Sequence, residues 1–181
     1  SDNGVGDGPW PEGVEPALRD QRIAIARTRP EFADAPGVRE IEALYKAAIE
    51  PAERLIYIEN QYLTVGAIAQ ALRRRLRDCP KLELVIITPD KCEGALETAV
   101  MDQGRARFVA TLGGATAERV RVLTPFSRGV GIHVHAKVMI VDDRFITLGS
   151  ANLANRSMGV DSETNLAIEH SEASPAIRGW R

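Results

Sequence analysis

The stretch that decides the fold runs from residue 135 to residue 142, His-Ala-Lys-Val-Met-Ile-Val-Asp, an apolar run that opens with a histidine and a lysine. Its β-branched residues predict a strand from Val134 to Val141. Because successive side chains of a strand point to opposite faces, His135 and Lys137 are expected on the same face. Asp142 has the opposite parity and stands where the run ends, so we expect it to have a structural role, as a cap or in a salt bridge.

A second apolar run leads into a turn of small residues, Gly-Ser-Ala-Asn at 149–152. Ser150 and Asn152 can donate hydrogen bonds to an anion, while their small neighbours permit close approach of the backbone. Hydrogen bonds to charged groups contribute about 1.5–3 kcal/mol each, so several of them can bind a phosphoryl group without a metal. With His135 as nucleophile or acid/base and Lys137 as a fixed cation, this set predicts a phosphodiester-cleaving site.

These spacings form one long pattern, His135-x-Lys137-x4-Asp142-x6-Gly149-Ser150-x-Asn152. It resembles the HxKxxxxD signature of the phospholipase D superfamily, and the resemblance continues through 156–159 and 161–163. Upstream, the block Ile-Tyr-Ile-Glu-Asn-Gln-Tyr at 56–62 resembles the strand that opens the C-terminal half of two-motif phospholipases D. The similarity extends from about Val38 to about Ile168.

The resemblance implies a metal-independent phosphodiesterase, without a cofactor, that hydrolyses or transphosphatidylates glycerophospholipids. Two motif histidines face each other in this family. One forms a phosphohistidine, and the other protonates the leaving group and then activates water or an alcohol. We favour the acid/base role for His135, although one motif leaves both roles open. Glu163 corresponds to the acid that bonds the far ring nitrogen of the histidine, where a carboxylate fixes the tautomer.

The chain carries one motif, because only His135 of its three histidines is followed by a lysine two residues later. We therefore interpret the chain as the C-terminal half of a two-motif enzyme. Residues 1–30 are expected to be a lead-in from a preceding half domain, and residues 31–181 the catalytic half domain. The second motif would come from an N-terminal half or from a second copy of the chain.

Four further residues are candidates for a rim that touches the substrate. Asn60 and Gln61 end a central strand, where ligand sites of α/β proteins tend to lie, although amides also form turns there. His133 precedes His135 by two residues, and Arg128 lies in a glycine-containing loop just before the catalytic strand.

Composition limits the alternatives. The 181 residues are 44% hydrophobic and 27% charged, as in an ordinary globular domain, and the net charge of −2 disfavours a general nucleic-acid binder. Nucleic acid remains a partner only under the alternative of a single-motif homodimeric endonuclease. A cardiolipin-type synthase would use the same chemistry, and a non-catalytic partner half is the alternative that is not an enzyme. No apolar run reaches the about 18 residues of a membrane span, so the chain is expected to be soluble or peripheral to a membrane. Its localisation stays open.

Periodicity predicts the remaining elements and the fold class. Helices are expected at 38–49, at 65–76 and at 95–112. Strands are expected at 21–29, 54–59, 82–88, 120–123, 134–141, 144–148 and 165–169. Strands that alternate with helices and then form a hairpin predict an α/β fold, a three-layer sandwich with a mixed sheet.

Overall fold

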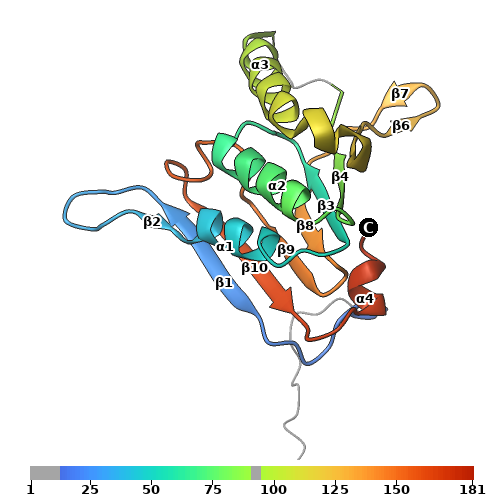
Figure 1. The fold of residues 1–181 in the computed structure, drawn as a ribbon. Helices are drawn as coiled ribbons and strands as arrows, with labels where there is room; N and C mark the ends of the chain where they lie inside the picture. Colours follow the sequence, from blue (N-terminus) through green and yellow to red (C-terminus); the bar gives the residue numbers. More distant parts are fainter. Residues whose placement is uncertain (1–12, 91–94) are drawn as a thin grey trace, which may run out of the picture.

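The computed structural model describes residues 13–90 and 95–181, with the backbone alone described for 95–100. An eight-stranded mixed sheet forms its centre, in the order β2-β1-β10-β9-β8-β3-β4-β5 (Figure 1). Its strands are β1 (Ala24–Arg29), β2 (Val38–Arg39), β3 (Leu55–Asn60), β4 (Glu83–Ile87), β5 (Val120–Leu123), β8 (Lys137–Val141), β9 (Phe145–Gly149) and β10 (Glu163–Glu169). A separate hairpin consists of β6 (Phe126–Ser127) and β7 (Val130–Gly131). The helices are α1 (Glu40–Ile49), α2 (Gly66–Asp78), α3 (Ala95–Leu112), the 3₁₀ helix η1 (Gly114–Arg119) and α4 (Pro175–Arg178).

The type of strand pairing changes once across the sheet, at β3. Strands β3, β4 and β5 are parallel, as expected for strands joined by helical crossovers, and the pairs on the other side of β3 are antiparallel. The predicted α/β class with a mixed sheet is confirmed.

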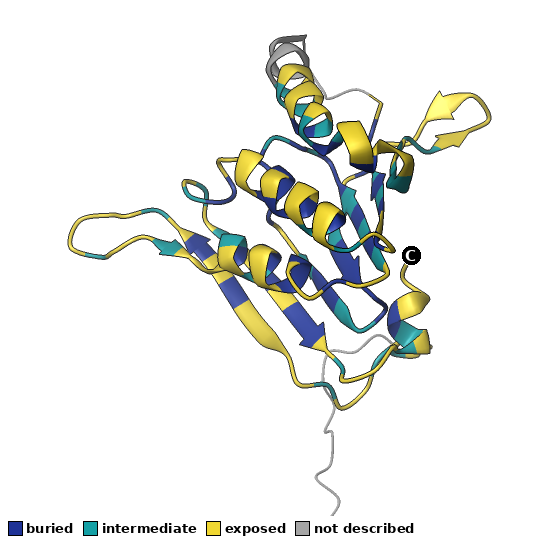
Figure 2. Ribbon diagram, in the orientation of Figure 1, coloured by how far each residue is buried: buried dark blue, intermediate teal, exposed yellow. Residues whose placement is uncertain are grey.

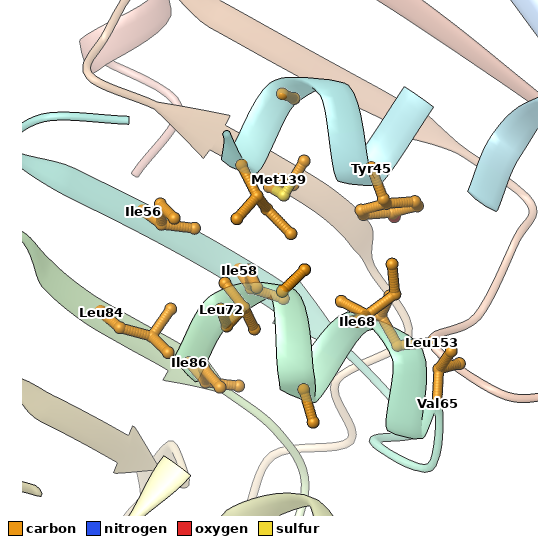
Figure 3. Packing of buried hydrophobic residues seen from close by; sticks show 14 of the residues in the cluster. Tyr45, Ile56, Ile58, Val65, Ile68, Leu72, Leu84, Ile86, Met139 and Leu153 are labelled. Carbon is orange, nitrogen blue, oxygen red and sulfur yellow. The ribbon is translucent and has the colours of Figure 1, made fainter. Parts of the chain in front are cut away.

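The main core lies between the sheet and helices α1 and α2, which cover one of its faces (Figure 2). Alternate residues of β3 point into this core, and Ile56 and Ile58 are fully buried there. They pack with helix residues such as Tyr45, Ile68 and Leu72 (Figure 3). Each large apolar side chain buried in this way contributes about 1.5–3 kcal/mol, which makes this face the main stabilising layer.

The second face of the sheet has a smaller cluster. Ile140, Ile146 and Ile168 pack there with Ile177 of α4, and all four are buried. Within residues 13–90 and 95–181, α4 is the helix that packs on this face, and it has only four residues. The third layer of the predicted sandwich is therefore thin in the described part of the chain.

Strand β1 belongs to the same sheet as the motif strands. It pairs with β10 along Ala24–Thr28 and with β2 at its other edge. The expected strand at 21–29 is thus present, and the sheet includes part of the range 1–30 that we assigned to the lead-in. Residues 1–12 of that range lie outside the described residues.

The strand that carries the histidine-lysine motif begins later than predicted. It was expected from Val134, but β8 starts at Lys137, and His135 lies in the segment that precedes it. The reason is the length of its partner, since Lys137 pairs with Asn60, the last residue of β3. Beyond that pair β3 has turned away, and the ladder has no further residue to bond.

Candidate functional site

Four residues lie in one row across the sheet, on the face that α1 covers. Asn60 pairs with Lys137 and Gly149 pairs with Asn165, and the register of β8 with β9 brings Lys137 beside Gly149. Strands β3 and β9 end at this row and β8 begins there, while β10 begins two residues before it, at Glu163. The fold therefore gathers the motif residues at a single edge of the sheet.

Lys137 is the cation of this edge. Its side chain is buried at 7% exposure, and its Nζ donates a hydrogen bond to the main-chain oxygen of His135 at 2.8 Å. Burial lowers the pKa of Lys137, and the negative charge of Glu163 opposes that change. Since an ammonium has three N–H donors, two remain for a ligand. The lysine is thus anchored beside the histidine with capacity left for an anion.

His135 itself is exposed. Its ring stacks on that of His133, with centroids 5.9 Å apart and planes at 19° to each other. The structure therefore places His133 beside the candidate catalytic histidine, and its contact with a substrate stays a prediction.

Glu163 is hydrogen-bonded to Ser150 in the turn at 149–152. It accepts a hydrogen bond from the Ser150 hydroxyl, which in turn accepts one from the backbone N–H of Thr164 at 3.0 Å. The only proton of the hydroxyl is used by Glu163, so Ser150 holds the carboxylate in place near Lys137. A bond from Glu163 to His135, which the resemblance implies, stays a prediction, as does donation from Ser150 to phosphate.

Gly149 is required by close packing. A Cβ at this position would lie 2.3 Å from the oxygen of Thr164 and 2.6 Å from Cα of Asn165, both of them backbone atoms. Backbone cannot move aside as a flexible side chain can, so glycine lets β9 and β10 meet at this point.

Asn165 is a buried residue of the site that the sequence reasoning missed. It is fully buried, its Oδ1 accepts from the N–H of Ala151 at 3.3 Å, and its Nδ2 donates to Thr147 at 3.4 Å. The hydroxyl of Tyr45 lies near Asn165 but makes no hydrogen bond of good geometry with it. Burial raises the pKa of the Tyr45 hydroxyl. One signal was available, an asparagine at an inward position of an apolar strand, where a polar group needs partners.

The side chain of Asn60 bonds the backbone just after the turn at 149–152. Its Oδ1 accepts from the backbone N–H groups of Leu153 at 3.0 Å and Tyr62 at 3.2 Å. Asn60 is fully buried and Gln61 is 7% exposed, so neither forms the exposed rim that we predicted. The physical reason is the parity of β3, which turns Asn60 into the core between the sheet and the helices.

Asn152 is half-buried on this turn. Its side-chain oxygen is buried and has no hydrogen-bond partner within the described residues. The turn thus contains a polar group whose bonding is incomplete.

Asp142 acts at the far end of the same strand. Its carboxylate accepts three backbone N–H groups, those of Glu53, Arg54 and Leu55, each at 2.8 Å. With about 3.3 Å per residue, the five residues of β8 put Asp142 roughly 16 Å from Lys137. The geometry agrees with a structural role and places this motif residue away from the candidate site.

Arg128 belongs to an element outside the main sheet. It is exposed at the tip of the β6–β7 hairpin, which projects from the sheet (Figure 1). A cavity of about 540 Å³ lies between the start of α2 and α3, and the predicted site residues are not among those that line it. The described residues contain no group of three His, Cys, Asp or Glu side chains that could hold a metal. They contain no helix long and apolar enough to cross a membrane.

Several known proteins are similar to this chain in sequence or in fold. A family model described as "Cardiolipin synthase, PLD-like domain" matches residues 45–180. Phospholipase D zeta 2 of Arabidopsis thaliana is 27% identical over 222 residues, which cover 94% of this chain and 21% of that protein. The chain thus spans about a fifth of the length of this curated relative.

Two solved structures are similar in fold. Nuc from Salmonella typhimurium, a phospholipase D family member, superimposes with a TM-score of 0.64 at 17% identity, and the match covers 89% of this chain and 90% of Nuc. Phosphatidylserine synthase of Haemophilus influenzae Rd KW20 gives a TM-score of 0.59 at 17% identity, covering 81% of this chain and 34% of that protein. Together with the family match over most of the sequence, these findings establish that the chain belongs to the phospholipase D superfamily.

Proposed function

We propose that this chain supplies one of two catalytic motifs of a phosphodiesterase that hydrolyses or transphosphatidylates glycerophospholipids through a phosphohistidine. The observation that carries the proposal is the buried ammonium of Lys137, bonded to the backbone of His135 and facing the charge of Glu163. Members of the superfamily are phosphodiesterases, and the lipid substrate is our inference from the block at 56–62 and from the phospholipase D relatives.

The chemistry has two displacements at phosphorus. One histidine nitrogen attacks phosphorus, the bond to the leaving oxygen breaks, and the opposing histidine gives its proton to that oxygen. Water or an alcohol then loses a proton to the second histidine and displaces the first. Lys137 stabilises the negative charge that grows on the phosphoryl oxygens in both steps.

One chain contains one such histidine, so the proposal requires a second motif. It would come from an N-terminal half or from another copy of the chain. The similarity to Nuc, which the match covers almost completely, favours the homodimeric endonuclease as the second candidate. A cardiolipin-type synthase differs only in its alcohol acceptor.

Solution mass and activity, measured on the same sample, test the proposal. An inactive monomer that turns over a phospholipid once the other motif half is added would support the lipid enzyme. A stable dimer that cleaves nucleic acid and leaves phospholipid intact would overturn it in favour of the endonuclease.

The charge of Glu163 gives a pH prediction. Lys137 must be protonated to stabilise the phosphoryl oxygens, so activity falls as pH rises through its pKa. Glu163 raises that pKa against the effect of burial. In Glu163→Gln the pKa falls further, and the alkaline limb of the pH–rate profile is expected to move to lower pH.

Glu169→Gln provides the matched control, because Glu169 is exposed at the other end of the same strand. Its alkaline limb should coincide with that of the unmodified chain. If Glu163→Gln instead moves only the acid limb, Glu163 acts on His135 and not on Lys137.

A further inference from the structure

We propose that the β6–β7 hairpin, together with Ile132, is a lipid-contacting element that inserts into the interface of an anionic membrane and brings His135 to its surface. This inference rests on the proposed function, because it names the surface from which that site would take its substrate.

The hairpin gathers exposed apolar side chains. Phe126 is 58% exposed, Val130 70% and Ile132 46%, and all three fall within seven residues. Figure 2 shows the hairpin in the colour of exposed residues, projecting beyond the end of β4. Large apolar side chains that cluster on an exposed projection mark a contact surface for a partner or a membrane.

The geometry of the hairpin favours lipid over protein. Phe126 pairs with Gly131 and Ser127 pairs with Val130, so Phe126 and Val130 point to opposite faces of the ribbon. A flat protein partner covers one face of a two-stranded ribbon and leaves the other in water. A lipid interface surrounds both faces, so it can bury the apolar side chains of Phe126 and Val130 at the same time.

The charge of the segment suits anionic headgroups. Residues 123–136 contain no aspartate or glutamate, and Arg128 is the charged residue of the hairpin. Arg128 and Gly129 form the tip, with φ of 50° and 80°. In a shallow insertion, about 5–10 Å deep, the tip enters first, and the long side chain of Arg128 can extend back toward the phosphates.

The hairpin is continuous with the site. The N–H of Ile132 donates to the oxygen of Pro125 at 2.8 Å and closes its base. Three residues later comes His135, at most about 10 Å further along an extended chain. Docking of the hairpin would therefore place the candidate catalytic histidine near lipid phosphates.

Vesicle sedimentation tests the inference without turnover. The chain is mixed with vesicles of phosphatidylcholine, with or without phosphatidylglycerol, and the bound fraction gives a partition coefficient. The double variant Phe126→Ser/Val130→Ser is expected to bind at least about tenfold more weakly. Arg128→Ala is expected to lose about fivefold on anionic vesicles and little on neutral ones.

Phe32→Ser is the matched control, because Phe32 is 78% exposed but lies outside the hairpin. It should bind vesicles like the unmodified chain, and thermal unfolding should show all variants folded. Unchanged binding of the double variant, or no binding by the unmodified chain, would overturn the inference. So would a double variant that changes only the oligomeric state, since this would assign the hairpin to a protein interface. If vesicles are bound but no phosphodiester is cleaved in any assembly, the proposed function fails and the lipid-contacting hairpin stands.

Discussion

Replacement of His135 by alanine is expected to reduce turnover of a soluble phosphodiester by at least about 10³-fold in the assembled enzyme. Both roles open to His135 predict this loss, because neither the P–N bond nor the protonated leaving group can form without the ring. His135 is exposed, so its removal should change the free energy of unfolding by less than about 0.5 kcal/mol.

His133→Ala is the control that separates the loss of the candidate catalytic imidazole of His135 from the loss of a neighbouring side chain. His133 is also exposed, and its ring stacks on that of His135. Its loss is expected to lower turnover by less than about tenfold, since it removes a ring contact and leaves both the motif histidine and Lys137 in place. Near-normal turnover of His135→Ala, or equal losses in the two variants, would contradict the assignment of His135.

Strand parity predicted the orientation of Lys137, and the resemblance to the family added Ser150 and Glu163 to the candidate site. Lys137, Ser150 and Glu163 do lie at one edge of the sheet, although 26 positions separate the first of them from the last. The hairpin between β8 and β9 was also predicted. Asp142 and Asp143 both have positive φ, at 53° and 57°, in the three-residue connection 142–144 between the paired residues Val141 and Phe145.

What the sequence did not predict depends on distant partners. The start of β8 depends on where β3 ends, and β3 lies more than 70 residues upstream. From the sequence alone, Asn60 is a candidate rim residue. In the structure its side-chain Oδ1 accepts a hydrogen bond from the backbone N–H of Leu153, 93 residues away. Asn165 was missed because an inward polar residue becomes a support only when Gly149 and Ala151 are brought against it. In each case the bonding partner is set by the register of the sheet.

The second large effect is expected on stability. Asp142→Ala should lower the free energy of unfolding by about 3–5 kcal/mol, because three N–H groups lose their acceptor in a part-buried position. Urea denaturation measures the change. The dependence of the unfolding free energy on urea concentration is compared between the variant and the unmodified chain. The same samples, assayed below their unfolding transition, give turnover per folded molecule.

Asp143→Ala separates the backbone contacts of Asp142 from the strain of the turn. Asp143 has a similar positive φ, but its carboxylate accepts from the side chains of Arg178 and Arg181. Ion pairs with partly exposed arginines contribute about 1 kcal/mol or less, so this variant should lose much less stability. If both variants fall equally, the turn conformation and not the three N–H groups explains the effect. If Asp142→Ala keeps its stability but loses turnover, the aspartate acts in the chemistry. We expect the opposite, since Asp142 lies at the far end of β8 and fixes the start of β3, the strand that positions Asn60 opposite Lys137.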